Sequence, residues 1–101
     1  MVETLKQQAQ RLLGDVPQEQ AFWVNDGCVV RNLKELNEEF KHMSNDIYLY
    51  HANGEKNDFA TWIKDVYGDE VLAANLRAAM NKEQAARAVA SRTNILSKRL
   101  T

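Results

Sequence analysis

Apolar residues recur at spacings of three and four along most of the chain, which is the period of an amphipathic helix. The clearest stripe lies on one face of the segment 58–67 and consists of Phe59, Trp62, Ile63 and Val66. Weaker stripes predict further helices over residues 3–13, 32–43, 69–80 and 81–100. The chain is therefore predicted to be mainly α-helical.

Residues 21–30 interrupt the helical pattern. Aromatic and β-branched residues flank Asp26–Gly27, and an Asp-Gly pair between two such runs is typical of a tight β-hairpin. Phe22 and Trp23 should then point to opposite faces of the ribbon. An isolated hairpin is only marginally stable, so this one must lie on an apolar surface. The predicted fold is a small helical domain with a short N-terminal β-hairpin and flanking terminal helices.

Polar residues with capping preferences mark where the helices should begin. The predicted N-caps are Asn32, Ser44, Asn57 or Asp58, Asp69 and Asn81. Gly68 should end the helix over 58–67 in the left-handed conformation. The segment 45–52 is consistent with a short helix or with a strand, and its serine cap and its length favour one or two helical turns.

The length and composition limit the class of protein. The chain has 101 residues, enough for one small domain, and 45% hydrophobic residues with 27% charged residues argue against disorder. No apolar run approaches the roughly 20 residues that cross a bilayer, and the N-terminus has no secretory signal pattern. Cys28 is the single cysteine, which excludes an internal disulfide and fits a reducing compartment. We therefore expect a cytoplasmic protein with no membrane partner.

The stripes also suggest how the chain is organised. An N-terminal helix in residues 1–18 and a basic helix in residues 81–101 flank a core domain in residues 19–80. The two terminal helices are the candidates for appendages, because the alanine-rich stripe of the last one is too thin to form a core alone. Such a stripe packs closely against another helix, so we expect the two terminal helices to pair with a second copy or with a partner protein.

Charge is unevenly spread although the net charge is only -1. Residues 81–101 carry an excess of basic side chains, and the candidates for phosphate contacts among them are Arg87, Arg92, Lys98 and Arg99. A solvated helix face explains the same residues. The isoelectric point of about 6.1 argues against a nucleic-acid-binding protein. Nucleic-acid association is therefore the alternative function.

Residues that could carry chemistry are few. His51 could act as a general base, but no nucleophile motif accompanies it. His42 and His51 are too far apart in the sequence for a zinc motif, and the acidic residues do not have the spacing of a calcium loop. The glycines form no phosphate-binding loop. We expect no enzymatic activity, no metal and no cofactor.

The aromatic residues lie between residues 22 and 67, and most of them should form the core. Trp23 or Tyr48 is the candidate for an exposed patch that binds a partner. His51 should instead contact the loop that precedes the helix over 58–67. The predicted structural motif consists of His51, Asn57, Asp58 and Trp62.

Residues 22–76 carry a recurring pattern that includes FWVNDG, NLKELNEEF, YHAN and KNDFATWIKDVYGDEVLAANL. This pattern resembles a small uncharacterised domain that recurs in archaeal and candidate-phylum bacterial proteins, and the run N-D-F-x-x-W-I-x-D-V-x-G-D is its specific part. The resemblance implies one folding unit over residues 22–76 and no established activity. Ala52 departs from the pattern, where a larger β-branched residue is expected. Together with the residue patterns, this predicts a non-enzymatic protein-interaction or adaptor module that binds a protein partner or a second copy.

Overall fold

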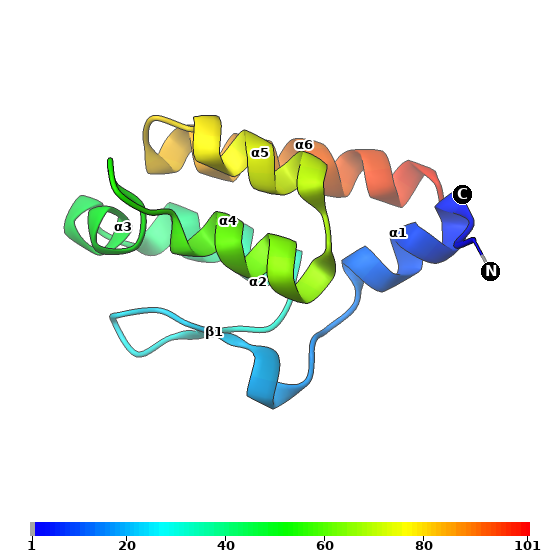
Figure 1. The fold of residues 1–101 in the computed structure, drawn as a ribbon, viewed down its shortest axis with the longest axis horizontal. Coiled ribbons are helices and arrows are strands. Elements are labelled where there is room, and N and C mark those ends of the chain that lie inside the picture. Colours follow the sequence, from blue (N-terminus) through cyan, green and yellow to red (C-terminus); the bar gives the residue numbers. More distant parts are fainter. Residues whose placement is uncertain (1) are drawn as a thin grey trace.

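The computed structural model describes residues 2–101 and confirms a mainly helical domain with a short hairpin near the N-terminus (Figure 1). It measures 41 × 27 × 23 Å. In chain order its elements are α1 (Leu5–Leu13), the 3-10 turn η1 (Gln18–Gln20), β1 (Phe22–Trp23), β2 (Val29–Val30), α2 (Leu33–His42), α3 (Asn45–His51), α4 (Asp58–Trp62), the π-helical turn η2 (Ile63–Tyr67), α5 (Glu70–Ala78) and α6 (Lys82–Lys98). None of the helices in residues 2–101 has the length and apolar character needed to span a bilayer.

The hairpin forms where the Asp-Gly pair predicted it. Its antiparallel strands pair Phe22 with Val30 and Trp23 with Val29. Gly27 has a φ of 96°, a conformation that glycine adopts without a steric penalty. The two faces of the ribbon differ as expected, because Phe22 is 8% exposed and Trp23 is 62% exposed.

Phe59 lies at the centre of an aromatic cluster. Its ring centroid is 5.1 Å from that of Phe22, 4.9 Å from that of Phe40 and 5.8 Å from that of Tyr48. Tyr48 stacks on Phe59 and is only 5% exposed. The prediction that Tyr48 could belong to an exposed patch is therefore wrong: the segment is helical, and its period turns residues 48 and 51 toward the core.

The helix that begins at residue 58 changes register before it ends. A π-helical turn over Ile63–Tyr67 adds a residue to the last turn, so Tyr67 is buried and Val66 is only partly buried. The Tyr67 hydroxyl donates a hydrogen bond to the Gly14 carbonyl at 3.0 Å, and burial raises the pKa of Tyr67 to about 12. Gly68, with a φ of 69°, ends the helix as predicted.

The terminal helices belong to the same core as the rest of the chain. Their buried apolar residues are Ala9, Leu12, Ala85, Val89 and Leu96. α6 packs along α2 and also contacts α1 and α5, and the start of α1 lies at the same end of the molecule as the C-terminus (Figure 1). Arg99 donates a hydrogen bond to the Gln8 side chain at 2.8 Å. The terminal helices therefore dock on residues 19–80 and are not appendages, because the thin stripe of α6 is completed by apolar side chains of other helices.

The predicted caps are present at five helix starts. The residues whose side chains accept a backbone hydrogen bond from the first turn are Asn32, Ser44, Asn57, Asp69 and Asn81. Glu35 and Gln84 occupy the third position of their helices, where a capping-box side chain accepts the N–H of the cap residue. Here they accept hydrogen bonds from the residues one position earlier, the N–H groups of Arg31 and Met80. These side chains satisfy backbone donors that the helices themselves leave without a partner.

Candidate protein-binding surface

His51 joins three segments of the chain at the edge of the core. Its Nδ1 lies 3.0 Å from an Asp58 carboxylate oxygen, and its Nε2 accepts a hydrogen bond from the Asn25 N–H at 3.0 Å. Both bonds are satisfied when the neutral ring carries its proton on Nδ1. The predicted contact between His51 and the 57–58 loop is present, and it extends to the hairpin. No ring nitrogen remains free to accept a proton from a substrate, so this geometry indicates a structural role for His51.

Asp58 is held as a carboxylate in this arrangement. Burial opposes its ionisation, but hydrogen bonds from Lys56 and His51 outweigh that effect and hold the pKa of Asp58 below its ordinary value. The neighbouring Asn57 donates from its side chain to the Leu76 carbonyl at 3.0 Å. Trp62 donates from its indole to the Gln20 carbonyl at 2.7 Å. The predicted structural motif therefore links the start of α4 to α5 and the end of α4 to the segment before the hairpin.

A His51→Ala substitution should lower the free energy of unfolding by about 1–3 kcal/mol, because it leaves the Asn25 N–H without a partner, leaves Asp58 with Lys56 alone, and opens space beside Phe22 and Phe59. Urea unfolding followed by circular dichroism measures the loss. His42→Ala is the matched control on an exposed histidine. An unfolding free energy equal to that of the control would contradict this account.

Arg92, expected at the surface, is buried. Its Nε donates to one Asp69 oxygen at 2.8 Å and its Nη2 to the other at 3.2 Å, and the two side chains are 9% and 2% exposed. The prediction of a phosphate contact by Arg92 is wrong, because the guanidinium is already bound to a buried carboxylate. The signal was in the sequence, since Arg92 continues the spacing of Ala85, Val89 and Leu96 on the buried side of α6.

The other basic candidates do not form a compact patch. Arg87 and Lys98 are exposed and are separated by 11 positions along α6, whereas Arg99 is engaged with Gln8. With Arg92 buried, the basic face expected on the last helix is reduced to isolated charges. Isolated charges attract phosphate groups less strongly than the clustered basic surface that is typical of nucleic-acid-binding proteins.

The outward side of the hairpin carries the exposed tryptophan. Trp23 is 62% exposed, and its cross-strand partner Val29 is only partly buried. Directly paired residues share one face of a ribbon, so Trp23 and Val29 form a small apolar surface, which we call the hairpin face. The opposite side of the ribbon is anchored by Phe22 and Val30 in the core. Trp23 is therefore an exposed aromatic residue whose backbone is fixed by the fold.

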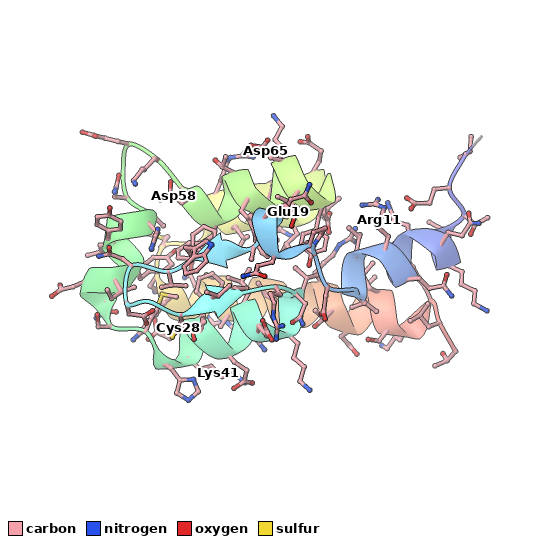
Figure 2. All side chains as sticks on the ribbon, turned by 90° about the horizontal axis from the view of Figure 1, so that it is seen from below. Arg11, Glu19, Cys28, Lys41, Asp58 and Asp65 are labelled. Atoms are coloured by element: carbon pink, nitrogen blue, oxygen red, sulfur yellow. The ribbon has the colours of Figure 1, made fainter. Side chains whose placement is uncertain are left out.

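A shallow hollow of about 580 Å³ adjoins the hairpin face, and Val29 contributes to both. We call it the acidic hollow, and its lining residues are Cys28, Val29, Asn32, Lys34, Glu35, Glu38 and Glu39. Glu35 pairs with Arg31 at 3.2 Å and Glu38 with Lys41 at 3.6 Å. Figure 2 shows Cys28 on the hairpin beside α2, with Asp65 on the far side of the molecule.

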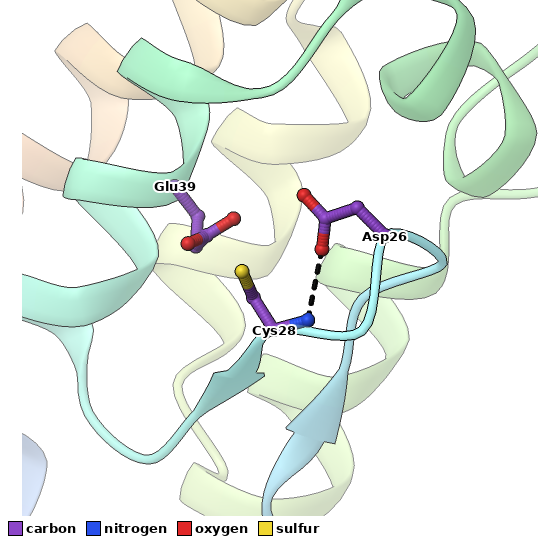
Figure 3. Close-up of side chains that lie close together, drawn as sticks. All are labelled: Asp26, Cys28 and Glu39. Atoms are coloured by element: carbon purple, nitrogen blue, oxygen red, sulfur yellow. Dashed lines mark hydrogen bonds between the residues drawn. The ribbon is translucent and has the colours of Figure 1, made fainter.

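Asp26, Cys28 and Glu39 lie close together (Figure 3), and Cys28 and Glu39 also line the hollow. One ligand atom from each lies within 4.8 Å of the others, and the Cys28 N–H donates to Asp26 at 2.9 Å. Sequence spacing did not reveal the group, because the hairpin and α2 bring it together. A thiol and two carboxylates are donors that divalent ions accept, but they are fewer than a closed four-ligand zinc site uses.

Hydrogen bonds to Asp26 and to Glu39, together with the charge of these carboxylates, raise the pKa of Cys28 to about 11. At about pH 8 its thiolate fraction should be about 100-fold below that of a thiol at the ordinary value. A thiolate of higher pKa is also more nucleophilic, and this offsets about tenfold of the loss. Alkylation of Cys28 by iodoacetamide should therefore be about tenfold slower in the folded chain than in the urea-unfolded chain. The double substitution Asp26→Asn with Glu39→Gln should remove most of this difference. Equal rates in the folded and unfolded chains would contradict the local negative field, because Cys28 is exposed and access is not limiting.

A second depression, of about 690 Å³, lies between the end of α3, the loop after it and the α5–α6 turn. Leu49 and Met80 contribute exposed apolar surface to it. Its charged lining residues are Glu55, Lys56 and Arg77, so it carries both signs of charge. Unlike the hairpin face, this depression has no tryptophan. Its mixed charge favours neither a basic nor an acidic partner.

The chain was compared with protein-family models, curated proteins and solved structures, and none of them matches it. The resemblance to the archaeal and bacterial domain therefore remains a prediction.

Proposed function

We propose that this protein is a non-enzymatic protein-interaction module and that the hairpin face with Trp23 is its binding surface. The observation that carries the proposal is a 62% exposed tryptophan on a strand whose other side is anchored in the core. Tryptophan is enriched among the residues that dominate binding energy at protein interfaces. An exposed indole on a fixed backbone also binds with little loss of conformational entropy.

The packing of the hairpin supports this choice of surface. Its tip is tied to α3 by the hydrogen bond from Asn25 to His51, and the segment before β1 is tied to α4 by Trp62. The ribbon is thus tied to the helical core at both of its ends. By contrast, the apolar stripes of α1 and α6, expected to bind a second copy, are largely used within the chain. The large apolar residues that remain exposed on these helices and at the C-terminus are Leu5, Ile95 and Leu100.

The proposal is tested by affinity capture with immobilised wild-type protein, Trp23→Ala and Tyr50→Ala. Tyr50 is 55% exposed and is a matched aromatic control outside the hairpin. A partner retained by the wild type and by Tyr50→Ala, but lost by Trp23→Ala, is the expected result. Circular dichroism should show that both variants keep the fold. Identical sets of captured proteins for all three would contradict the hairpin face as the binding surface.

A further inference from the structure

Carboxylates outnumber basic side chains in the hollow that adjoins the hairpin face. The acidic hollow contains three glutamates and one lysine, and Asp26 stands at its edge. Glu35 and Glu38 already have basic partners. Asp26 and Glu39 form no ion pair with any basic side chain of residues 2–101. Two carboxylates next to an apolar surface are therefore left to bind a positive charge from elsewhere.

We propose that the partner is a basic peptide segment, with an apolar side chain on the hairpin face and an arginine or lysine in the acidic hollow. This inference rests on the proposed function and adds the chemistry of the partner. The apolar part of the segment would cover Trp23 and Val29. Its cation would lie between Asp26 and Glu39, whose oxygen atoms face each other across Cys28 (Figure 3). Charge complementarity of this kind selects the partner and steers its approach.

The surroundings of Cys28 are consistent with a cation at this place. The same two carboxylates raise the pKa of the Cys28 thiol, first by hydrogen bonds and then by their charge. Bridging guanidinium or ammonium groups would satisfy acceptors that the chain itself leaves without a basic partner, and arginine offers five donors in a planar fork. The second depression has no comparable excess of one charge, because Lys56 and Arg77 oppose Glu55.

The test is selection from a random peptide library displayed on phage, using immobilised wild-type protein at low salt. We expect the selected pool to be enriched in arginine and lysine. Representative peptides should bind about tenfold more weakly to Asp26→Asn with Glu39→Gln, and more weakly at high salt. These substitutions keep the size of each side chain, and Asn at position 26 can still accept from the Cys28 N–H. Asp65→Asn, on the far side of the molecule, is the control and should leave binding unchanged (Figure 2).

The outcomes separate this inference from the proposed function. A neutral or acidic pool that loses binding in Trp23→Ala overturns the basic partner and leaves the hairpin face as the binding surface. A basic pool that binds the Asp26→Asn, Glu39→Gln variant as well as the wild type also overturns the inference. A pool that is indifferent to Trp23→Ala, or the selection of no peptide at all, counts against both.

Discussion

Replacing Arg92 with alanine is expected to lower the free energy of unfolding by about 3–5 kcal/mol, the largest effect we expect from any charged residue of this chain. The substitution leaves the Asp69 carboxylate, 2% exposed, without its cation. Asp69 also accepts the Leu72 N–H at the start of α5, so an uncompensated charge here disturbs the corner between η2 and α5. Urea unfolding followed by circular dichroism gives the value directly.

Arg87→Ala is the matched control, because it removes an exposed arginine from the same helix. Its effect should stay within about 0.5 kcal/mol. A double-mutant cycle with Asp69→Ala should show that removing both partners costs less than the sum of the single losses. A loss for Arg92→Ala no larger than that for Arg87→Ala would show that the ion pair does not form in solution.

Phe59→Ala is the second substitution with a large expected effect, a loss of about 3–5 kcal/mol. Phe59 is 1% exposed, and its ring contacts aromatic rings from β1, α2 and α3. Its removal should therefore weaken the packing of the hairpin as well as that of the helices. Amide hydrogen exchange should show that protection in the hairpin falls together with the global stability.

Phe59→Leu keeps an apolar side chain in the same place and should cost less than Phe59→Ala. Tyr50→Ala removes an exposed aromatic ring and should change stability by no more than about 0.5 kcal/mol. If Phe59→Ala lost no more stability than Tyr50→Ala, the aromatic cluster would not be the centre of the core.

The features that depend on neighbouring residues in the sequence could be predicted. The hairpin follows from Asp26–Gly27, and the helix starts follow from short polar caps, because these are local hydrogen-bond effects. Most residues of the specific run N-D-F-x-x-W-I-x-D-V-x-G-D have a structural role, as helix caps, core residues or hydrogen-bond partners. The cap of α4, the partner of His51, three core residues, the left-handed glycine and the partner of Arg92 are Asn57, Asp58, Phe59, Trp62, Ile63, Gly68 and Asp69. That run therefore describes how the domain is held together.

The features that depend on distant residues could not be predicted in the same way. The helical spacing places Arg92 on the buried side of α6, but it does not identify the partner, which is Asp69, 23 positions away in the sequence. The apolar stripe of α6 predicts that another helix packs on it, but the pattern does not distinguish a helix of the same chain from one of a second copy. The group formed by Asp26, Cys28 and Glu39 exists because the hairpin lies beside α2. The added residue of the π-helical turn likewise changes which side chain faces inward, and the regular helical period does not include it.

The central claim is that partners bind the hairpin face, and amide NMR of isotope-labelled protein titrated with a selected peptide tests it most directly. The account predicts chemical-shift changes concentrated in residues 22–30 and in the part of α2 that lines the acidic hollow, with changes at the Trp23 indole N–H and none at the buried Trp62 indole. Changes concentrated instead around Leu49 and Met80 would place the binding surface in the second depression and contradict the account.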